Sequence, residues 1–159
     1  MIVISNTSPI SNLAAIGQLD LLRQLYQEVV IPQAVQDELL ADNGIHPCAV
    51  IQTQNWIKLR AVANRALVTA LQAELDEGEA ETIALAIEMS ASLVLMDERI
   101  GRVVAGRFNL RVIGLLGVLI EARQSGLVSE IKPLLNALIQ AGFWISQDLF
   151  TRVLQAAGE

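Results

Sequence analysis

Residues 79–97 read EAETIALAIEMSASLVLMD, and the fold prediction starts from this run. Its first half has apolar residues at helical spacing and predicts a helix from about Glu79 to Met89. Its second half, residues 93–96, is a continuous apolar run of strand length that stops at Asp97. A helix followed by a buried strand is half of a βαβ unit, so the run predicts a parallel sheet covered by helices.

Strand-type and helix-type runs alternate along the rest of the chain. Further strands are predicted at residues 2–4, 28–31 and 110–113, and residues 56–59 form either a short edge strand or an irregular connection. Helices are predicted to open at Pro9 after a Ser8 cap, to precede residue 110, and to cover about residues 19–26, 32–41, 64–75, 114–125, 131–141 and 147–156. The pattern predicts an α/β fold, a three-layer α/β/α sandwich with a central, mainly parallel sheet. We expect residues 1–159 to form a single domain with a C-terminal helical extension from about residue 127.

Composition and charge narrow the class of protein. The chain has 159 residues, 53% of them hydrophobic, which is enough to bury a sizeable core. It has no apolar run near the roughly 18–20 residues of a membrane helix, and its N-terminus does not resemble a signal peptide. The lone cysteine, Cys48, cannot form an internal disulfide, which fits a reducing cytoplasm. A net charge of −6 argues against a general nucleic-acid coat protein. We expect a cytoplasmic protein with no membrane segment.

Polar residues follow two of the predicted strands. Asn6 comes just after residues 2–4, and Asp97 comes directly after residues 93–96. Because α/β folds of this kind bind ligands outside the carboxyl ends of their strands, these ends are the expected place for a site. An acid that follows four buried apolar residues is poorly placed for free solvation. The alternative for Asp97 is that it caps the helix that follows it.

Two glutamates lie on predicted inward faces of helices. Glu38 lies three residues after Val35 and shares its apolar stripe, although it could instead lie at the margin of that stripe with its carboxylate in solvent. Glu79 lies four residues before Ile83 on an inward row, whereas Glu81 points elsewhere. Favourable charge at a helix N-terminus is the alternative for Glu79 and a sufficient reason for Glu81.

The carboxylates of Glu38, Glu79 and Asp97 are predicted to converge at one edge of the sheet. Several carboxylates held close together raise one another's pKa unless a cation neutralises them. Oxygen ligands at this density suit Mg²⁺ or Mn²⁺ rather than zinc. His46 and Cys48 lie in a predicted loop with no matching second pair, so a zinc site is not expected.

Four motifs follow one another along the chain. They are VISNTSP at residues 3–9, IPQAVQDEL at 31–39, DEGEAETIALA at 76–86 and LVLMDERIGR at 93–102. In this order they resemble the PIN-domain superfamily and, within it, the PIN-like group labelled DUF3368, which is found as toxins of bacterial toxin–antitoxin pairs. The tail from Gly126 to Ser146 looks like the C-terminal signature of that group, so the resemblance covers nearly the whole chain.

The resemblance implies a metal-dependent ribonuclease with four site positions. Three of them fall on Glu38, Glu79 and Asp97, and the first falls on Asn6, where the common PIN pattern has Asp. Thr7 takes the position of a hydroxyl near the site. A neutral amide oxygen can still ligate Mg²⁺, but the site keeps three carboxylates, which support one ion better than the two ions of two-metal phosphodiester cleavage.

The leading hypothesis is a Mg²⁺- or Mn²⁺-dependent endoribonuclease that is the toxin of a toxin–antitoxin pair and has RNA as its substrate. Arg99 or Arg102, just beyond Asp97, would hold the RNA phosphate, and the alternative for both is a solvated helix face. A binding module with weak or no catalysis is the alternative function, favoured by Asn6 and the net acidity. A phosphatase or nucleotide-binding domain ranks below both, because no Gly-x-Gly-x-x-Gly follows the first strand and no Walker A run is present.

Two partners are expected besides RNA. The resemblance implies a small antitoxin protein, whose basic arm would suit an acidic groove. The apolar face of the predicted helix from Leu115 to Ala122, together with the tail, is more than one small domain is expected to cover, which predicts a homodimer.

Overall fold

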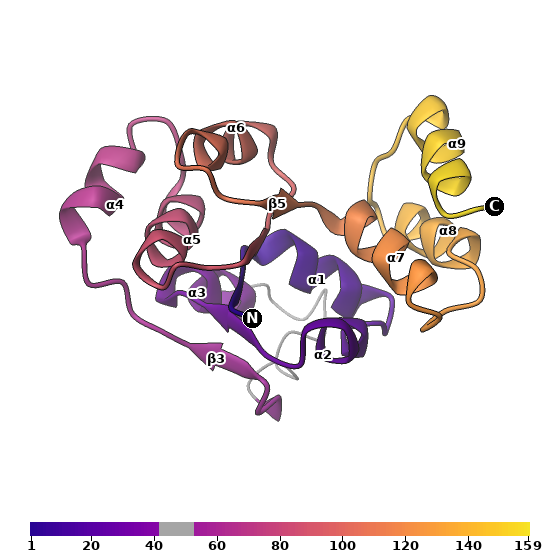
Figure 1. Cartoon of the computed structure of the whole chain (residues 1–159), viewed down its shortest axis with the longest axis horizontal. Helices are drawn as coiled ribbons and strands as arrows, with labels where there is room; N and C mark the ends of the chain where they lie inside the picture. Colours follow the sequence, from indigo (N-terminus) through magenta and orange to yellow (C-terminus); the bar gives the residue numbers. More distant parts are fainter. Residues whose placement is uncertain (42–52) are drawn as a thin grey trace.

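The structure is a computed structural model that describes residues 1–41 and 53–159. Strands and helices alternate along the chain (Figure 1). The strands are β1 (Val3–Ser5), β2 (Val29–Ile31), β3 (Ile57–Leu59), β4 (Leu93–Leu95) and β5 (Val112–Ile113). The helices are α1 (Thr7–Ala15), α2 (Asp20–Tyr26), α3 (Gln33–Ala41), α4 (Arg65–Leu71), α5 (Glu77–Glu88), α6 (Arg99–Arg107), α7 (Leu115–Gln124), α8 (Lys132–Gln140) and α9 (Gln147–Ala156). None of these described helices is long and apolar enough to cross a membrane.

Five strands form one sheet in the described part of the chain. Their order is β3-β2-β1-β4-β5, and every neighbouring pair is parallel. β1 lies at the centre, where Ile4 pairs with Val30 of β2 and with Val94 of β4. Parallel neighbours need a long crossover connection, which helices supply here. The predicted parallel sheet is confirmed, and residues 57–59 form its edge strand.

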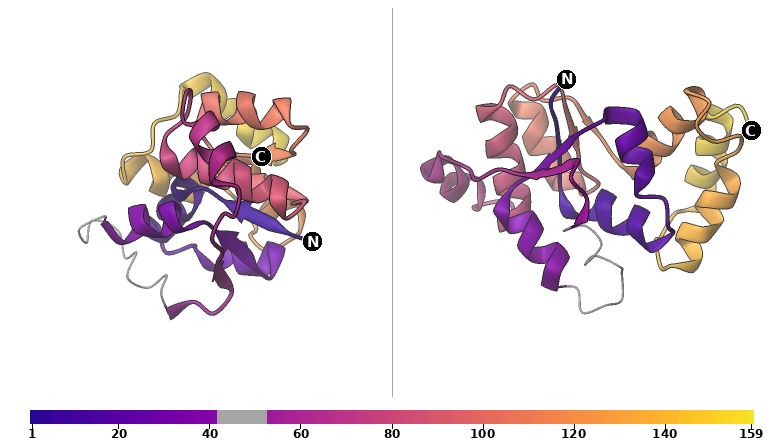
Figure 2. Two further views of the ribbon diagram at one scale, coloured as in Figure 1. Left: turned by 90° about the vertical axis from the view of Figure 1, so that its left-hand side faces the viewer. Right: turned by 90° about the horizontal axis from the view of Figure 1, so that it is seen from below.

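Strand side chains alternate between two hydrophobic cores, one on each face of the sheet. Leu93 and Leu95 pack with α1, α2, α3 and α7 on what we name the α1 face. Val94 and Met96 pack with α4, α5 and α6 on the α5 face. Because successive strand residues point to opposite faces, a run that is apolar at every position belongs to a sheet buried on both sides. The layers form the predicted α/β/α sandwich, with α5 and the C-terminal helices on opposite sides of the strands (Figure 2).

Helix α5 begins at Glu77, two residues earlier than predicted. The Asp76 carboxylate accepts a hydrogen bond from the Glu79 N–H (2.8 Å), and the Glu79 carboxylate accepts one from the Asp76 N–H (3.1 Å). This reciprocal capping box satisfies backbone donors that a helix end otherwise leaves free. Residues 76–78 therefore form the start of α5 and do not belong to a loop before it. Helix α4, expected to reach residue 75, ends at Leu71.

Helix α1 also begins earlier than predicted, at Thr7 with Asn6 as its N-cap. Pro9 then lies within the first turn, where a proline is tolerated because its missing N–H has no partner there. The expected Ser8 cap is wrong: the Ser8 hydroxyl donates a hydrogen bond to the Asp97 carboxylate (3.0 Å) instead. Because α1 starts at Thr7, Asn6 lies at the end of β1, and Thr7 and Ser8 lie at the edge of the sheet.

The apolar face of α7 is covered from within the chain. Leu115, Val118 and Leu119 are fully buried and pack in one core with Leu135 and Leu138 of α8. Helices α7, α8 and α9 gather at one end of the molecule (Figure 1). The expectation is therefore wrong for the α7 face, because the tail covers it. A homodimer and the single-domain division with an extension from about residue 127 remain predictions.

Candidate active site at the carboxyl edge of the sheet

The ends of β1 and β4 bring three polar residues together. Ser5 pairs with Leu95, and the Asn6 N–H donates to the Leu95 carbonyl (2.9 Å). Asn6 therefore leaves the sheet beside Asp97 and Glu98, which follow β4. Helix α3 and the start of α5 lie against each other over this edge. They bring Glu38 and Glu79 to the same end of the sheet.

Glu38 lies at the margin of its apolar stripe, so the predicted inward orientation is wrong and the marginal alternative holds. Leu39 is buried, whereas Glu38 is exposed. Its carboxylate nevertheless has a fixed place, because the Thr7 hydroxyl donates a 2.6 Å hydrogen bond to it. Gly78 of α5 comes so close that a Cβ there would collide with the same carboxylate. Glu38 is thus held between α1 and α5 at the carboxyl edge.

Glu79 faces inward as predicted and is only 8% exposed. One of its oxygens accepts the Asp76 N–H in the capping box, so the helix N-terminus alternative applies as well. The second oxygen, Oε1, accepts no hydrogen bond from a described residue. One carboxylate can therefore close the cap and still offer an oxygen to a ligand.

Burial and neighbouring charges raise the pKa of both glutamates. Burial is the largest cause for Glu38, whose pKa the Thr7 hydrogen bond lowers and the charges of Asp76 and Glu98 raise. Burial is also the largest cause for Glu79, whose pKa the Asp76 N–H lowers and the charges of Asp76, Glu98 and Glu38 raise. Glu98 therefore acts on both carboxyl groups. Asp97 is not among the charges that raise either pKa.

Asn6 is nearly fully buried, at 4% exposed. Its Nδ2 donates to the Glu98 carboxylate (3.2 Å), whereas its Oδ1 has no hydrogen-bond partner among the described residues. A buried polar atom without a partner costs about 1–3 kcal/mol. The carboxylate that contacts this amide, Glu98, has no proton to donate to the unpaired oxygen when it is ionised. A cation would satisfy it.

Asp97 does not cap the helix that follows it. Its Oδ1 accepts the N–H of Leu115, the first residue of α7 (2.7 Å), and its Oδ2 accepts the Ser8 hydroxyl (3.0 Å). Gly114 lets the two chain segments approach, since a Cβ there would lie 2.7 Å from Asp97 Oδ1. Helix α6 has Glu98 as its N-cap, without a side-chain cap bond. Asp97 therefore fixes the start of α7 to the ends of β4 and α1.

Glu98 was not predicted as a site residue from the sequence, although the alternation of side chains along the strand indicates which face it points to. Val94 and Met96 point to the α5 face, and Glu98 continues that alternation. Asp97 continues the row of Leu93 and Leu95, which points to the α1 face. Because strand side chains alternate along residues 93–98, Asp97 and Glu98 point to opposite faces of the sheet.

The residues present fit a divalent cation. In the described ranges, no group of three or more His, Cys, Asp or Glu side chains is placed to hold a metal ion by itself. The donors at the edge are nevertheless all oxygens, and one of them, Asn6 Oδ1, is buried and unpaired. Hard cations such as Mg²⁺ take carboxylate and amide oxygens and keep several waters, so they do not need a closed cage of protein ligands. His46 and Cys48 lie outside the described residues.

Arg99 and Arg102 are exposed on α6. With Asp97, Val103 and two residues near β5 they line an open pocket of about 490 Å³. Neither arginine forms an ion pair with a described residue. Both readings of the sequence, phosphate binding and a solvated helix face, fit this exposure.

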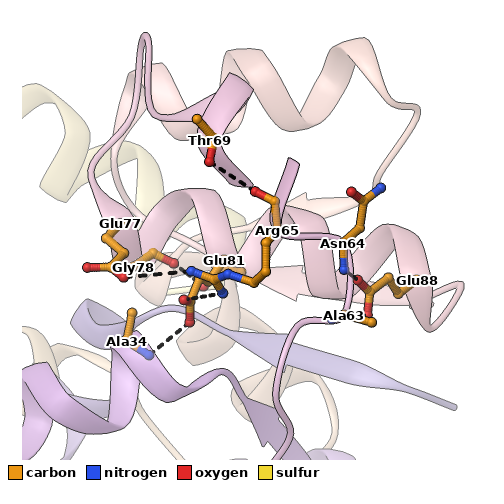
Figure 3. A network of polar contacts seen from close by, with 10 residues as sticks. Ala34, Ala63, Asn64, Arg65, Thr69, Glu77, Gly78, Glu81 and Glu88 are labelled. Carbon is orange, nitrogen blue, oxygen red and sulfur yellow. Dashed lines mark hydrogen bonds and ion pairs between the residues drawn. The ribbon is translucent and has the colours of Figure 1, made fainter. Parts of the chain in front are cut away.

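Glu81 has a structural role that the sequence did not reveal. It is 3% exposed, and its carboxylate accepts the Ala34 N–H at the start of α3 (2.9 Å) and pairs with Arg65 (2.8 Å). Figure 3 shows it between α3 and the chain around Arg65. Its main contacts are therefore with the start of α3 and with Arg65, not with the N-terminus of its own helix. Glu81 fixes α3 to α5, and this contact sets Glu38 relative to Glu79.

A family model agrees with this geometry. The model described as DUF3368, PIN domain, matches residues 2–159. The chain belongs to the PIN-domain family. No curated protein matches the sequence. PIN domains are generally nucleases and typically use divalent metal ions, so this PIN domain is read as a hydrolase that acts on nucleic acid.

Proposed function

We propose that this PIN domain is a divalent-metal-dependent endoribonuclease. The observation that supports it most is the buried Asn6 Oδ1, which has no hydrogen-bond partner among the described residues and lies at the acidic edge with Glu38 and Glu79. A buried acceptor at an edge that also carries several carboxylates fits a cation. The membership of a nuclease family points the same way.

Mg²⁺ or Mn²⁺ is the proposed cofactor, because every donor at the edge is an oxygen. Asn6, Glu38, Glu79 and an acid after β4 would hold it, and the sequence motif assigns that last position to Asp97. When bound, the ion would lower the pKa of a water and stabilise the negative charge that develops on the phosphodiester.

The remaining contacts of the chain would orient these groups. The Thr7 hydroxyl holds Glu38, and the capping box with Asp76 holds Glu79. Arg99 and Arg102 would bind the RNA phosphate in the pocket beside Asp97. Fixed donors and acceptors cost no reorganisation when the substrate arrives.

Cleavage of a labelled RNA with Mn²⁺, with Mg²⁺ and with excess EDTA tests this proposal. We expect Glu38→Gln and Glu79→Gln to lose about 100-fold or more of the metal-stimulated rate. Glu28→Gln is the matched control, since Glu28 is exposed at the amino end of β2, away from the site. A rate that survives EDTA, or that falls equally in the control, would contradict the proposal.

The toxin role is proposed from the family resemblance and needs its own test. Expression of the wild-type chain in the bacterial cytoplasm should arrest growth, and Glu79→Gln should relieve the arrest. Co-expression of the small protein encoded beside its gene should also relieve it and yield a stable complex. Normal growth with wild-type protein at the same level would exclude the toxin role.

A binding module is the second candidate, favoured by the neutral Asn6 and the net charge of −6. In that case the domain acts through an antitoxin or a second copy, with little catalysis. The two candidates differ for Asn6→Asp. A metal enzyme with a weakened site should bind Mn²⁺ more tightly and cleave faster with a fourth carboxylate. No gain in either would favour the binding module.

A further inference from the structure

Two consecutive acids, Asp97 and Glu98, follow β4, and only one of them has its carboxylate committed elsewhere. Both oxygens of Asp97 accept hydrogen bonds, from Leu115 N–H and from the Ser8 hydroxyl. Gly114 packs closely on the same carboxylate. Asp97 is therefore occupied by α7 and α1.

Glu98 lies on the other side of the β4 end. By the strand alternation it follows Val94 and Met96 toward the α5 face, where Glu79 lies. Asn6 obeys the same rule, since it follows Ile4, another residue of the α5 face. The two side chains meet: Asn6 Nδ2 donates to Glu98 Oε2 at 3.2 Å.

The Glu98 side chain also does not stabilise a helix end. It is exposed and makes no side-chain cap for α6, and within the described ranges the Asn6 amide is the only hydrogen-bond partner of its carboxylate. Asn6 and Thr7 are consecutive residues, and their side chains donate to Glu98 and to Glu38, so these two carboxylates are held by the same segment of the chain. The same amide carries the unpaired, buried Oδ1.

We propose that Glu98 completes the divalent-cation site with Asn6, Glu38 and Glu79, and that Asp97 is a positioning residue that ties the end of β4 to α7. This proposal rests on the proposed metal-dependent function. It replaces the motif-based ligand, Asp97, by its neighbour. It also explains why a buried amide donates to one carboxylate: the N–H orients Glu98 while the amide oxygen remains available to the ion.

Isothermal titration of the RNA-free protein with Mn²⁺ tests the proposal without measuring activity. We expect Glu98→Gln to weaken Mn²⁺ binding by about 100-fold, and Asp97→Asn to weaken it by no more than about tenfold while it lowers the melting temperature. Glu28→Gln should bind as the wild type does. The reverse order, with binding lost in Asp97→Asn and retained in Glu98→Gln, would overturn the proposal.

Two further results keep the test decisive. If Asp97→Asn does not fold, Glu98→Gln alone decides, because Glu98 is exposed and its substitution leaves the core intact. Ser8→Ala then serves as the milder change on the Asp97 side, and it should leave Mn²⁺ affinity nearly unchanged. Absence of Mn²⁺ binding by the wild type would instead refute the metal-dependent function itself, and the Glu98 assignment with it.

Discussion

Asn6 shows how the two ends of one buried amide can have different roles. Its N–H group is satisfied by Glu98, while its oxygen has no partner in the part of the chain that the structure describes. In the proposed site that oxygen contacts the ion without adding a fourth negative charge. Because this ligand oxygen is neutral, the site attracts metal ions less strongly than one with four carboxylates, which favours one ion over two.

Gly78 tests whether the contact between α5 and Glu38 matters. We expect Gly78→Ala to push the Glu38 carboxylate away and to weaken Mn²⁺ binding, with little change in the free energy of unfolding, because that carboxylate is the far end of an exposed, flexible side chain. Gly106→Ala in α6 is the control, because a Cβ there meets nothing within 4 Å. It should be neutral or stabilise the helix. Equal effects of the two substitutions would contradict the close approach.

The raised pKa of Glu38 predicts a pH dependence of stability. Between the ordinary value of 4.5 and the raised folded value, the folded protein binds more protons than the unfolded chain, so stability falls as pH rises. We expect this fall in metal-free wild type to be smaller in Glu38→Gln, as measured by urea unfolding at several pH values. Saturating Mn²⁺ should remove the fall in the wild type, because a bound cation favours the ionised carboxylate. Identical pH profiles of the two proteins would contradict the prediction.

Residue identities in the site were only partly predictable from the sequence. Asn6 and Glu79 lie where the strand ends and the helical spacing put them. Asp97 was placed correctly in the chain, but its partner is Leu115, 18 residues away, and no local pattern reveals that contact. Glu98 was missed although the alternation of residues 93–98 assigned it to the α5 face.

At the scale of elements, the buried Glu81 fixes α3 to α5. Its carboxylate accepts the Ala34 N–H in the first turn of α3 and pairs with Arg65, the first residue of α4 (Figure 3). Because Glu38 lies on α3 and Glu79 on α5, this contact sets the spacing of the two carboxylates. Glu81 is thus a positioning residue for the site.

We expect Glu81→Gln to lower the free energy of unfolding by about 1–3 kcal/mol, since the Ala34 N–H and Arg65 lose a charged acceptor. Mn²⁺ binding should weaken as the helices separate. Glu77→Gln is the matched control: Glu77 is exposed and lies 3.9 Å from the same arginine, so its loss should cost less than about 0.5 kcal/mol. Urea unfolding measures both, and a greater loss in the control would contradict this role.

The order of helices and strands was predictable because apolar residues have a different spacing in helices and in strands. The starts of α1 and α5 were not placed correctly, since the caps compete with other local signals. For α5 the Asp76 to Glu79 spacing is the signature of a capping box, and it outweighs the helix-breaking tendency of Gly78. For α1 the Ser8 hydroxyl has a partner in β4's end that no local reading could supply.

At the scale of the molecule, the site depends on a strand order that no single segment encodes. The pairing of β1 with both β2 and β4 brings Asn6 beside residues more than 90 positions later. Likewise, the covering of α7 by α8 and α9 is a long-range result of packing. The sequence showed the apolar face of α7 but could not show what covers it.

The packing of α8 on α7 predicts that the tail is part of the core. Leu138 is 1% exposed, and we expect Leu138→Ala to cost about 2–5 kcal/mol in thermal or urea unfolding. Ile139, the next residue, is 42% exposed and provides the control, because Ile139→Ala removes little buried surface. A single unfolding transition that shifts in Leu138→Ala would support one domain. A separate early transition would contradict it.

In the proposed site, the carboxyl edge of this sheet binds one divalent ion through Asn6 and its neighbouring carboxylates. A crystal structure of the protein soaked with Mn²⁺, with anomalous difference maps, tests it most directly. We expect one peak at about 2.0–2.2 Å from Asn6 Oδ1, with oxygens of Glu38, Glu79 or Glu98 and water around it. A map without a peak there, in crystals that bind Mn²⁺ elsewhere or not at all, would contradict it.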